Sequence, residues 1–266
     1  MNDTDTTPQM QSPSYRLAAL DQDFLLGESM RGVRFLLEFA KADEQLRAAG
    51  IRSTLVVFGS ARVREDGPGR QAHWYAEARN FGRIASERGG ALNGVANGGM
   101  RVRDNVIATG GGPGIMEAAN RGATEAGALS IGFNITLPQE QRPNTWSTPS
   151  LSFRFHYFAM RKMHLAMRAN ALVVFPGGFG TMDELFELLT LRQTDKAPRI
   201  PIVLAHREYW QSILNFERLV EHGMIDRDDL DLFGFAEDAE GIWAELLARG
   251  LTPHASIELE AEQEKP

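Results

Sequence analysis

The chain has 266 residues, of which 43% are hydrophobic and 24% are charged, and its formal net charge is -7 at pH 7. This mixture is ordinary for a globular protein, and one α/β domain can reach roughly 200–250 residues, so we expect a single folded domain. The acidic balance argues against binding of nucleic-acid polymers, and a sequence without cysteine has no disulfides, thiolate metal sites or cysteine nucleophile.

The two ends of the chain differ in composition from its middle. Residues 1–14 and 251–266 are polar, which predicts a disordered N-terminal tail and a flexible C-terminal tail. Residues 15–50 predict a helical extension, because apolar residues recur at helical spacing between Met30 and Ala49. We find no secretory leader and no apolar run long enough to span a bilayer, so we expect a cytoplasmic protein with no membrane partner.

From residue 54 to residue 205, short apolar runs alternate with stretches of helical periodicity. The runs include TLVVF, DNVIAT, LSIGFNI, ALVVF and PIVLA, and this alternation predicts an α/β domain with a parallel sheet over residues 51–250. The Gly- and Asn-rich stretch 89–103 predicts an inserted surface loop. Helices are expected near residues 71–87, over IMEAANRGATEAG after the second glycine turn, near 159–168, after ALVVFPGGFGT to about residue 191, and near 209–221 and 238–249.

Glycine-containing turns follow three of these runs, at Gly59-Ser60, at 110–114 and at 176–181. In open parallel sheets ligands bind beyond the carboxyl ends of the strands, and glycine lets backbone N–H groups approach an oxyanion there. None of these turns has the Walker A or G-x-G-x-x-G pattern, which favours a mononucleotide over an ATPase or dehydrogenase site. The alternative is that the glycines only form tight turns, and it weighs most at Gly59-Ser60.

Charged residues near these turns each allow two interpretations. Thr181 and Glu184 form T-x-x-E, the signature of a helix capping box, but a carboxylate there could instead face a ribose and stabilise an oxocarbenium-like transition state. Arg161, His164 and Arg168 share one face of an expected helix, which is ordinarily a solvated basic face. No histidine pair has the spacing of a metal-binding motif, so we predict no metal site.

Taken together, the segments GGGPGIMEAANRGA, MRK at 160–162 and PGGFGTMDE at 176–184 resemble the LOG (LONELY GUY) family. These are cytokinin-activating phosphoribohydrolases that were formerly labelled lysine decarboxylase-like, and the resemblance covers roughly residues 54–205. It implies a Rossmann-like, doubly wound parallel sheet with helices on both faces. It also implies hydrolysis of the N-glycosidic bond of a nucleoside 5′-monophosphate, AMP or N6-prenylated AMP, to the free base and ribose 5-phosphate.

Matched residue by residue, the resemblance implies that Arg161 and Glu184 are catalytic, with no cofactor and no metal. The substrate-binding residues that it implies are Ser60, Gly111, Gly112, Lys162, Gly177, Gly178, Gly180 and Thr181. The N-terminal extension, the 89–103 insertion and the GGGPGIMEA form of the glycine motif resemble the longer bacterial members. A homo-oligomer, a dimer or larger, is therefore expected, and the preferred base is left open.

Other functions remain as alternatives. The main one is a non-catalytic nucleotide-binding or sensing protein of the same fold. A pyridoxal-phosphate lysine decarboxylase would need a Schiff-base lysine, for which Lys162 and Lys196 are available without a recognisable cofactor motif around either. Binding of single-stranded DNA conflicts with the acidic balance of the chain.

Overall fold

The computed structural model describes residues 5–92, 95–97, 100–136, 142–197 and 199–253. Its centre is a seven-stranded sheet in the order β6-β5-β4-β1-β7-β8-β9, in which all neighbouring strands are parallel. The strands are β1 (Thr54–Phe58), β4 (Val106–Thr109), β5 (Ser130–Ile135), β6 (Ser152–Phe155), β7 (Ala169–Val174), β8 (Ile202–Ala205) and β9 (Gly234–Ala236). The expected α/β fold with a Rossmann-like parallel sheet is confirmed.

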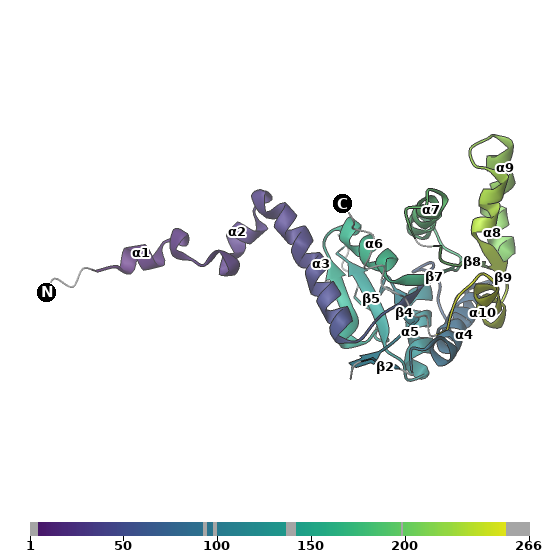
Figure 1. Cartoon of the computed structure of the whole chain (residues 1–266), viewed down its shortest axis with the longest axis horizontal. Coiled ribbons are helices and arrows are strands. Elements are labelled where there is room, and N and C mark those ends of the chain that lie inside the picture. Colours follow the sequence, from purple (N-terminus) through teal and green to yellow (C-terminus); the bar gives the residue numbers. More distant parts are fainter. Residues whose placement is uncertain (1–4, 93–94, 98–99, 137–141, 198, 254–266) are drawn as a thin grey trace.

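Helices cover both faces of the sheet, so its central strands are apolar on both sides. In β1, Leu55 and Val57 pack in one core, and Val56 and Phe58 pack in the other. The first core is covered by α4 (Gln71–Gly89), α5 (Ile115–Glu125) and α10 (Ala239–Ala248). The second is covered by α3 (Arg31–Ala48), α6 (Phe158–Met167), α7 (Phe179–Gln193), α8 (Arg207–Ile213) and α9 (Phe216–Glu221), as Figure 1 shows.

The order in which strands are added to the sheet changes side at β1. Strands β4, β5 and β6 are added on one side of it, and β7, β8 and β9 on the other. The connections that leave neighbouring strands on the two sides of such a switch point diverge, which opens a crevice at the carboxyl ends of the strands. The turns after β1, β4 and β7 are the three Gly-containing turns of the sequence.

Two segments differ from the sequence-based expectation. The single helix predicted for 209–221 is two helices, because α8 ends at Ile213 and the Asn215 side chain accepts a hydrogen bond from the Arg218 N–H at 3.1 Å, which starts α9. In the stretch expected to be a loop, β2 (Val95–Asn97) and β3 (Met100–Val102) form an antiparallel pair. Short 3₁₀ turns lie at η4 (Pro149–Leu151) and η5 (Arg227–Leu232).

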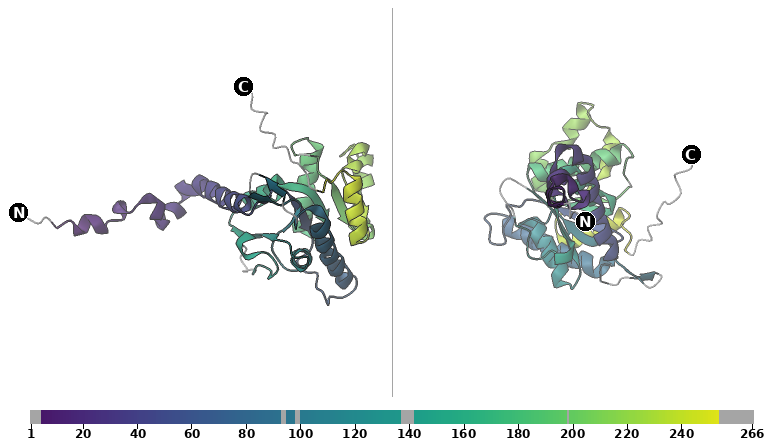
Figure 2. Two further views of the ribbon diagram at one scale, coloured as in Figure 1. Left: turned by 60° about the horizontal axis from the view of Figure 1, so that its bottom comes forward. Right: turned by 90° about the vertical axis from the view of Figure 1, so that its left-hand side faces the viewer.

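An arm precedes α3 and projects away from the sheet (Figure 2). It consists of α1 (Thr7–Gln11), η1 (Pro13–Tyr15), η2 (Ala18–Leu20), α2 (Gln22–Leu26) and η3 (Glu28–Met30), and none of these elements has a buried residue. The boundaries predicted for the tail 1–14, the extension 15–50 and the domain 51–250 stay predictions. Most of the predicted C-terminal tail, residues 254–266, lies outside the described residues. Among the described helices we find none with the length and apolar character that a bilayer crossing needs.

Candidate functional site

A pocket of about 600 Å³ opens at the switch point of the sheet. Its walls are the end of β1 with the turn that follows, the loop and first turns after β7, and side chains from α5, α6 and α8. Seven of the ten residues predicted from the sequence line it: Ser60, Arg161, Gly177, Gly178, Gly180, Thr181 and Glu184. The structure therefore brings together most of the predicted site.

The loop after β7 presents the N-terminus of α7 to this pocket. Helix α7 begins at Phe179 with Gly178 at its N-cap, and Gly178 and Gly180 are exposed. A Cβ on Gly177 would collide with the Thr181 hydroxyl, so only glycine allows this close approach of loop and helix. First-turn N–H groups and the helix dipole both favour an anion, so the geometry suits a phosphate group.

Glu184 lies inside α7 and points into the protein. Because the N-cap is Gly178, which makes no side-chain capping bond, Thr181 and Glu184 do not form the capping box that their spacing allowed. Glu184 is only 6% exposed, and its Oε1 lies 3.5 Å from Nη1 of Arg161. The capping interpretation is therefore wrong, and the carboxylate is available to the pocket.

Arg161 reaches the pocket from the second turn of α6. Its Nε donates to the carbonyl oxygen of Phe133 at 2.8 Å, which fixes the plane of the guanidinium. A Cβ on Gly110 would lie 2.5 Å from Nη2, so the glycine after β4 makes room for this side chain. His164 is buried and the Arg168 side chain is 12% exposed, so the interpretation of a solvated basic face is wrong.

Burial dominates the electrostatics of the pair. It raises the pKa of Glu184 above its ordinary value, and the nearby charges of Arg161 and Lys162 oppose that shift. It lowers the pKa of Arg161, and Glu184 opposes that shift in turn. Arg161 and Glu184 meet through one contact at 3.5 Å, so the Glu184 carboxylate can still accept a hydrogen bond from a ligand. Buried charged pairs with shifted pKa values in a cleft are typical of functional sites.

Three predicted residues lie elsewhere. Lys162 turns away from the pocket, and its Nζ lies 2.8 Å from a carboxylate oxygen of Asp183 and 2.8 Å from one of Glu187. Gly111 and Gly112 are buried and do not line the pocket, and their carbonyl oxygens accept hydrogen bonds from Asn144. Adjacent residues on a helix point in different directions, which is why Arg161 and Lys162 do not reach the same ligand.

Tyr209 is a pocket residue that sequence reasoning missed. It lies in the first turn of α8, its side chain lines the pocket, and its hydroxyl donates to the Gly177 carbonyl oxygen at 2.8 Å. Tyr209, which follows β8, therefore supports the loop after the neighbouring strand β7. The available signal was its place just after the run PIVLA, at the carboxyl end of a strand.

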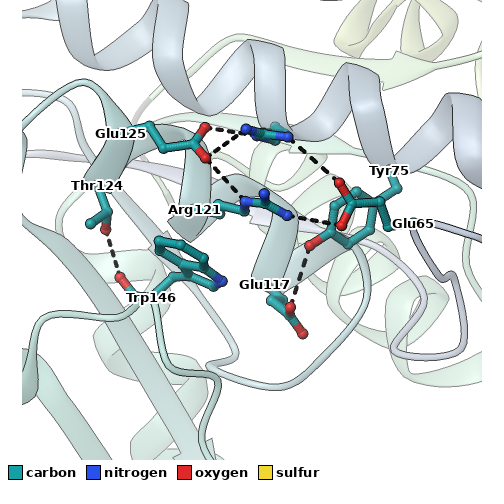
Figure 3. A network of polar contacts seen from close by, with 8 residues as sticks. Glu65, Tyr75, Glu117, Arg121, Thr124, Glu125 and Trp146 are labelled. Carbon is teal, nitrogen blue, oxygen red and sulfur yellow. Dashed lines mark hydrogen bonds and ion pairs between the residues drawn. The ribbon is translucent and has the colours of Figure 1, made fainter.

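Arg121 of α5 holds the loop 61–70, whose first two residues line the pocket, and Figure 3 shows the contacts of Arg121. Its Nη1 donates to Glu65 at 2.9 Å, and its Nε donates to Glu125 at 3.0 Å. The guanidinium also lies 5.1 Å from the ring centroid of Trp146. This network joins the loop after β1 to α5 and to the segment that precedes β6.

The fold and pocket define a class: Rossmann-like α/β proteins with a helix N-terminus and a buried acid–arginine pair at the switch point. A family model described as possible lysine decarboxylase matches residues 116–246. A rice (Oryza sativa subsp. japonica) protein named probable cytokinin riboside 5′-monophosphate phosphoribohydrolase LOG4 is 27% identical over 51% of this chain and 59% of its own length. Rice LOGL5, with the same enzyme name, is 26% identical over 67% of this chain and 64% of its own.

Arabidopsis thaliana LOG3, named cytokinin riboside 5′-monophosphate phosphoribohydrolase, is 27% identical over 46% of this chain and 56% of its own length. The chain thus spans less than two thirds of the length of these relatives. The solved structure of TM1055, a structural genomics target, matches with a TM-score of 0.50 at 19% identity, over 74% of this chain and 99% of that one, and shares the fold. Over about half of its length, the chain is thus similar to proteins of the LOG family.

Proposed function

We propose that this chain hydrolyses the N-glycosidic bond of a nucleoside 5′-monophosphate, AMP or N6-prenylated AMP, to the free base and ribose 5-phosphate. The observation that carries the proposal is the buried Arg161–Glu184 pair in the same pocket as the N-terminus of α7. The names of the rice and Arabidopsis relatives support it, because those proteins are named as enzymes of this reaction.

In this proposal the phosphate lies at the N-terminus of α7, near Gly178, Gly180 and Thr181. Binding energy from that remote group positions the sugar at the reacting centre, which favours monophosphates over nucleosides. The Glu184 carboxylate stabilises the positive charge that develops at C1′ as the C–N electron pair leaves with the base. Water adds its oxygen to C1′ and keeps one proton there as the new hydroxyl, and its other proton ends on the departing base. Arg161 orients the nucleotide and keeps the carboxylate toward the sugar.

The test incubates the purified protein with AMP and, separately, with isopentenyladenosine monophosphate. Free base and ribose 5-phosphate are separated by chromatography and quantified. We expect both products in equal amounts from at least one nucleotide, and the ratio of kcat/KM values then ranks the bases. Tight nucleotide binding without product would instead support the non-catalytic sensing protein.

Substitution of the acid makes the test specific to the site. Glu184→Gln keeps the shape of the side chain and removes its charge, so we expect kcat to fall by about 100-fold or more. Glu187→Gln is the matched control, because Glu187 lies one turn further along α7, outside the pocket. Full turnover by Glu184→Gln would show that the reaction does not depend on this carboxylate.

A further inference from the structure

Helix α3 supplies the cap that α6 lacks. At the N-cap of α6, Tyr157 makes no side-chain capping bond. The Glu38 carboxylate of α3 accepts hydrogen bonds from the N–H groups of His156 at 2.8 Å and Tyr157 at 3.2 Å. Arg34, one turn earlier on α3, donates from Nε to the Tyr157 hydroxyl at 3.0 Å. A carboxylate at this point satisfies exposed N–H groups and complements the helix dipole.

The same helix also holds the middle and the end of α6. The ring of His164 stacks on Phe39 of α3 with centroids 5.3 Å apart, and its Nε2 lies 3.1 Å from the Phe39 carbonyl oxygen. Just beyond the last residue of α6, Arg168 forms a hydrogen-bonded ion pair with Asp43, and each of these side chains is only 12% exposed. Figure 1 shows α3 beside α6 on one face of the sheet. Contacts at its start, at its middle and just beyond its end therefore tie α6 to α3.

Arg161 lies between these anchor points. It is four residues after Tyr157 and three before His164, so any shift of α6 moves its guanidinium relative to Glu184, which belongs to α7. We propose that Glu38 is a positioning residue, which caps α6 from the N-terminal extension and thereby holds Arg161 against Glu184. This inference rests on the proposed function and gives α3 a role in it. The loop after β7, which we propose to bind the phosphate, leads into α7 and takes part in none of these contacts.

The principal variant is Glu38→Ala, and the matched control is Glu44→Ala, an exposed glutamate on the same helix. Hydrolysis of the nucleotide that wild type cleaves is followed in both. For Glu38→Ala we expect kcat to fall about 10-fold or more, because small misplacements of catalytic groups are costly. We expect KM to change much less than kcat, because the loop after β7 is untouched. Glu38→Gln keeps an acceptor oxygen at the cap and should recover part of kcat.

A second readout does not depend on activity. In protein labelled with ¹³C at glutamate carboxyls, the signal of Glu184 is assigned by its loss in Glu184→Gln and then titrated. The Arg161 charge opposes the upward pKa shift that burial imposes on Glu184, and so does Lys162 on the same helix. We therefore expect the pKa of Glu184 to be higher in Glu38→Ala than in wild type and unchanged in the control. A smaller folded fraction would lower kcat but would not move this pKa.

Wild-type kcat together with a wild-type Glu184 pKa in folded Glu38→Ala overturns the proposal. If Glu38→Ala does not fold, Glu38→Gln replaces it, since this change removes the charge and one of the two oxygens that accept from the His156 and Tyr157 N–H groups. It should raise the Glu184 pKa in the same direction by less, and an unchanged pKa overturns the proposal there too. If wild type releases no base from either nucleotide, the proposed function fails, and the carboxyl titration still decides the positioning role.

Discussion

At the scale of single residues, the side chain of Glu184 is 8% exposed and that of Arg161 is 12% exposed. The proposed reaction needs the ionised carboxylate, and burial raises the pKa of Glu184 above its ordinary value of 4.5. Activity should therefore fall as pH decreases through a value higher than 4.5. A pH profile of kcat/KM measures this limb. An acid limb at or below 4.5 in wild type would contradict the assignment of Glu184.

Substitution of Arg161, the ion-pair partner of Glu184, tests the same assignment of the acid limb more directly. Arg161→Gln removes the positive charge that opposes the upward pKa shift, so the acid limb should move to still higher pH as kcat falls. Glu187→Gln is the control for a charge change on the neighbouring surface of α7. If the acid limb of Arg161→Gln stays at the wild-type pH, the charge of Arg161 does not control the protonation of Glu184.

His206 is a second buried titratable residue, at the N-cap of α8 in a left-handed conformation with φ of 67°. Burial, with the charges of His73 and Arg70, lowers its pKa from 6.5 to about 4, and Asp238 opposes the shift. Above pH 6.5 the ring is neutral in both folded and unfolded chains and contributes no pH dependence. Between pH 6.5 and 4 the unfolded chain binds the proton and the folded one does not, so stability falls by about 3 kcal/mol.

Denaturant unfolding at a series of pH values checks this expectation. His206→Asn tolerates the left-handed conformation, and its unfolding free energy should fall less between pH 6.5 and 4 than that of wild type. The variant can be less stable at every pH because it lacks the packed ring, so the test compares only how the unfolding free energy changes with pH. His222→Asn, at an exposed histidine, is the control. Equal pH slopes in wild type and His206→Asn would refute the role of this ring.

At the scale of elements, the segment before β6 supports the glycine turn after β4. The Asn144 side chain donates to the Gly112 carbonyl oxygen at 3.0 Å and accepts from the N–H groups of Trp146 and Ser147 at 3.0 and 3.1 Å. Asn144→Ala leaves these buried groups without their partner, so we expect a loss of about 2–4 kcal/mol of unfolding free energy. Chemical denaturation measures it, with the exposed neighbour in Thr145→Ala as control. A loss no larger than that of the control would show that water replaces these bonds.

The sequence predicted the elements whose patterns are local. Apolar runs before glycine turns located the parallel strands, and a 3.6-residue period located α3, α4 and α10. It did not predict the break between α8 and α9, where the Asn215 cap outweighs continuous helical periodicity. Nor could it choose between the two interpretations of Glu184, because the T-x-x-E pattern does not state where the helix begins. The start at Gly178 places Glu184 within α7, which only the tertiary path of the loop after β7 decides.

At the scale of the whole molecule, the arm before α3 presents large apolar side chains to solvent. Those that are most exposed are Met10 at 63%, Tyr15 at 66%, Leu17 at 72%, Leu20 at 75% and Leu26 at 70%. Large apolar side chains that recur along one exposed segment favour a role of this segment in a protein interface. It supports the proposal that the chain forms a homo-oligomer, in which the arm packs against a second copy.

Sedimentation velocity over a range of protein concentrations tests this assembly. We expect wild type to sediment as a dimer or larger, and Leu20→Glu to dissociate at concentrations at least about 10-fold higher than wild type does, because burying one leucine contributes roughly 1.5–3 kcal/mol. Met224→Glu, at an exposed methionine of the body, is the matched control and should sediment as wild type. A monomeric wild type would refute the oligomer. An oligomeric wild type with an unchanged Leu20→Glu would move the interface from the arm to the body, because a charge at a packed leucine cannot be accommodated without loss of affinity.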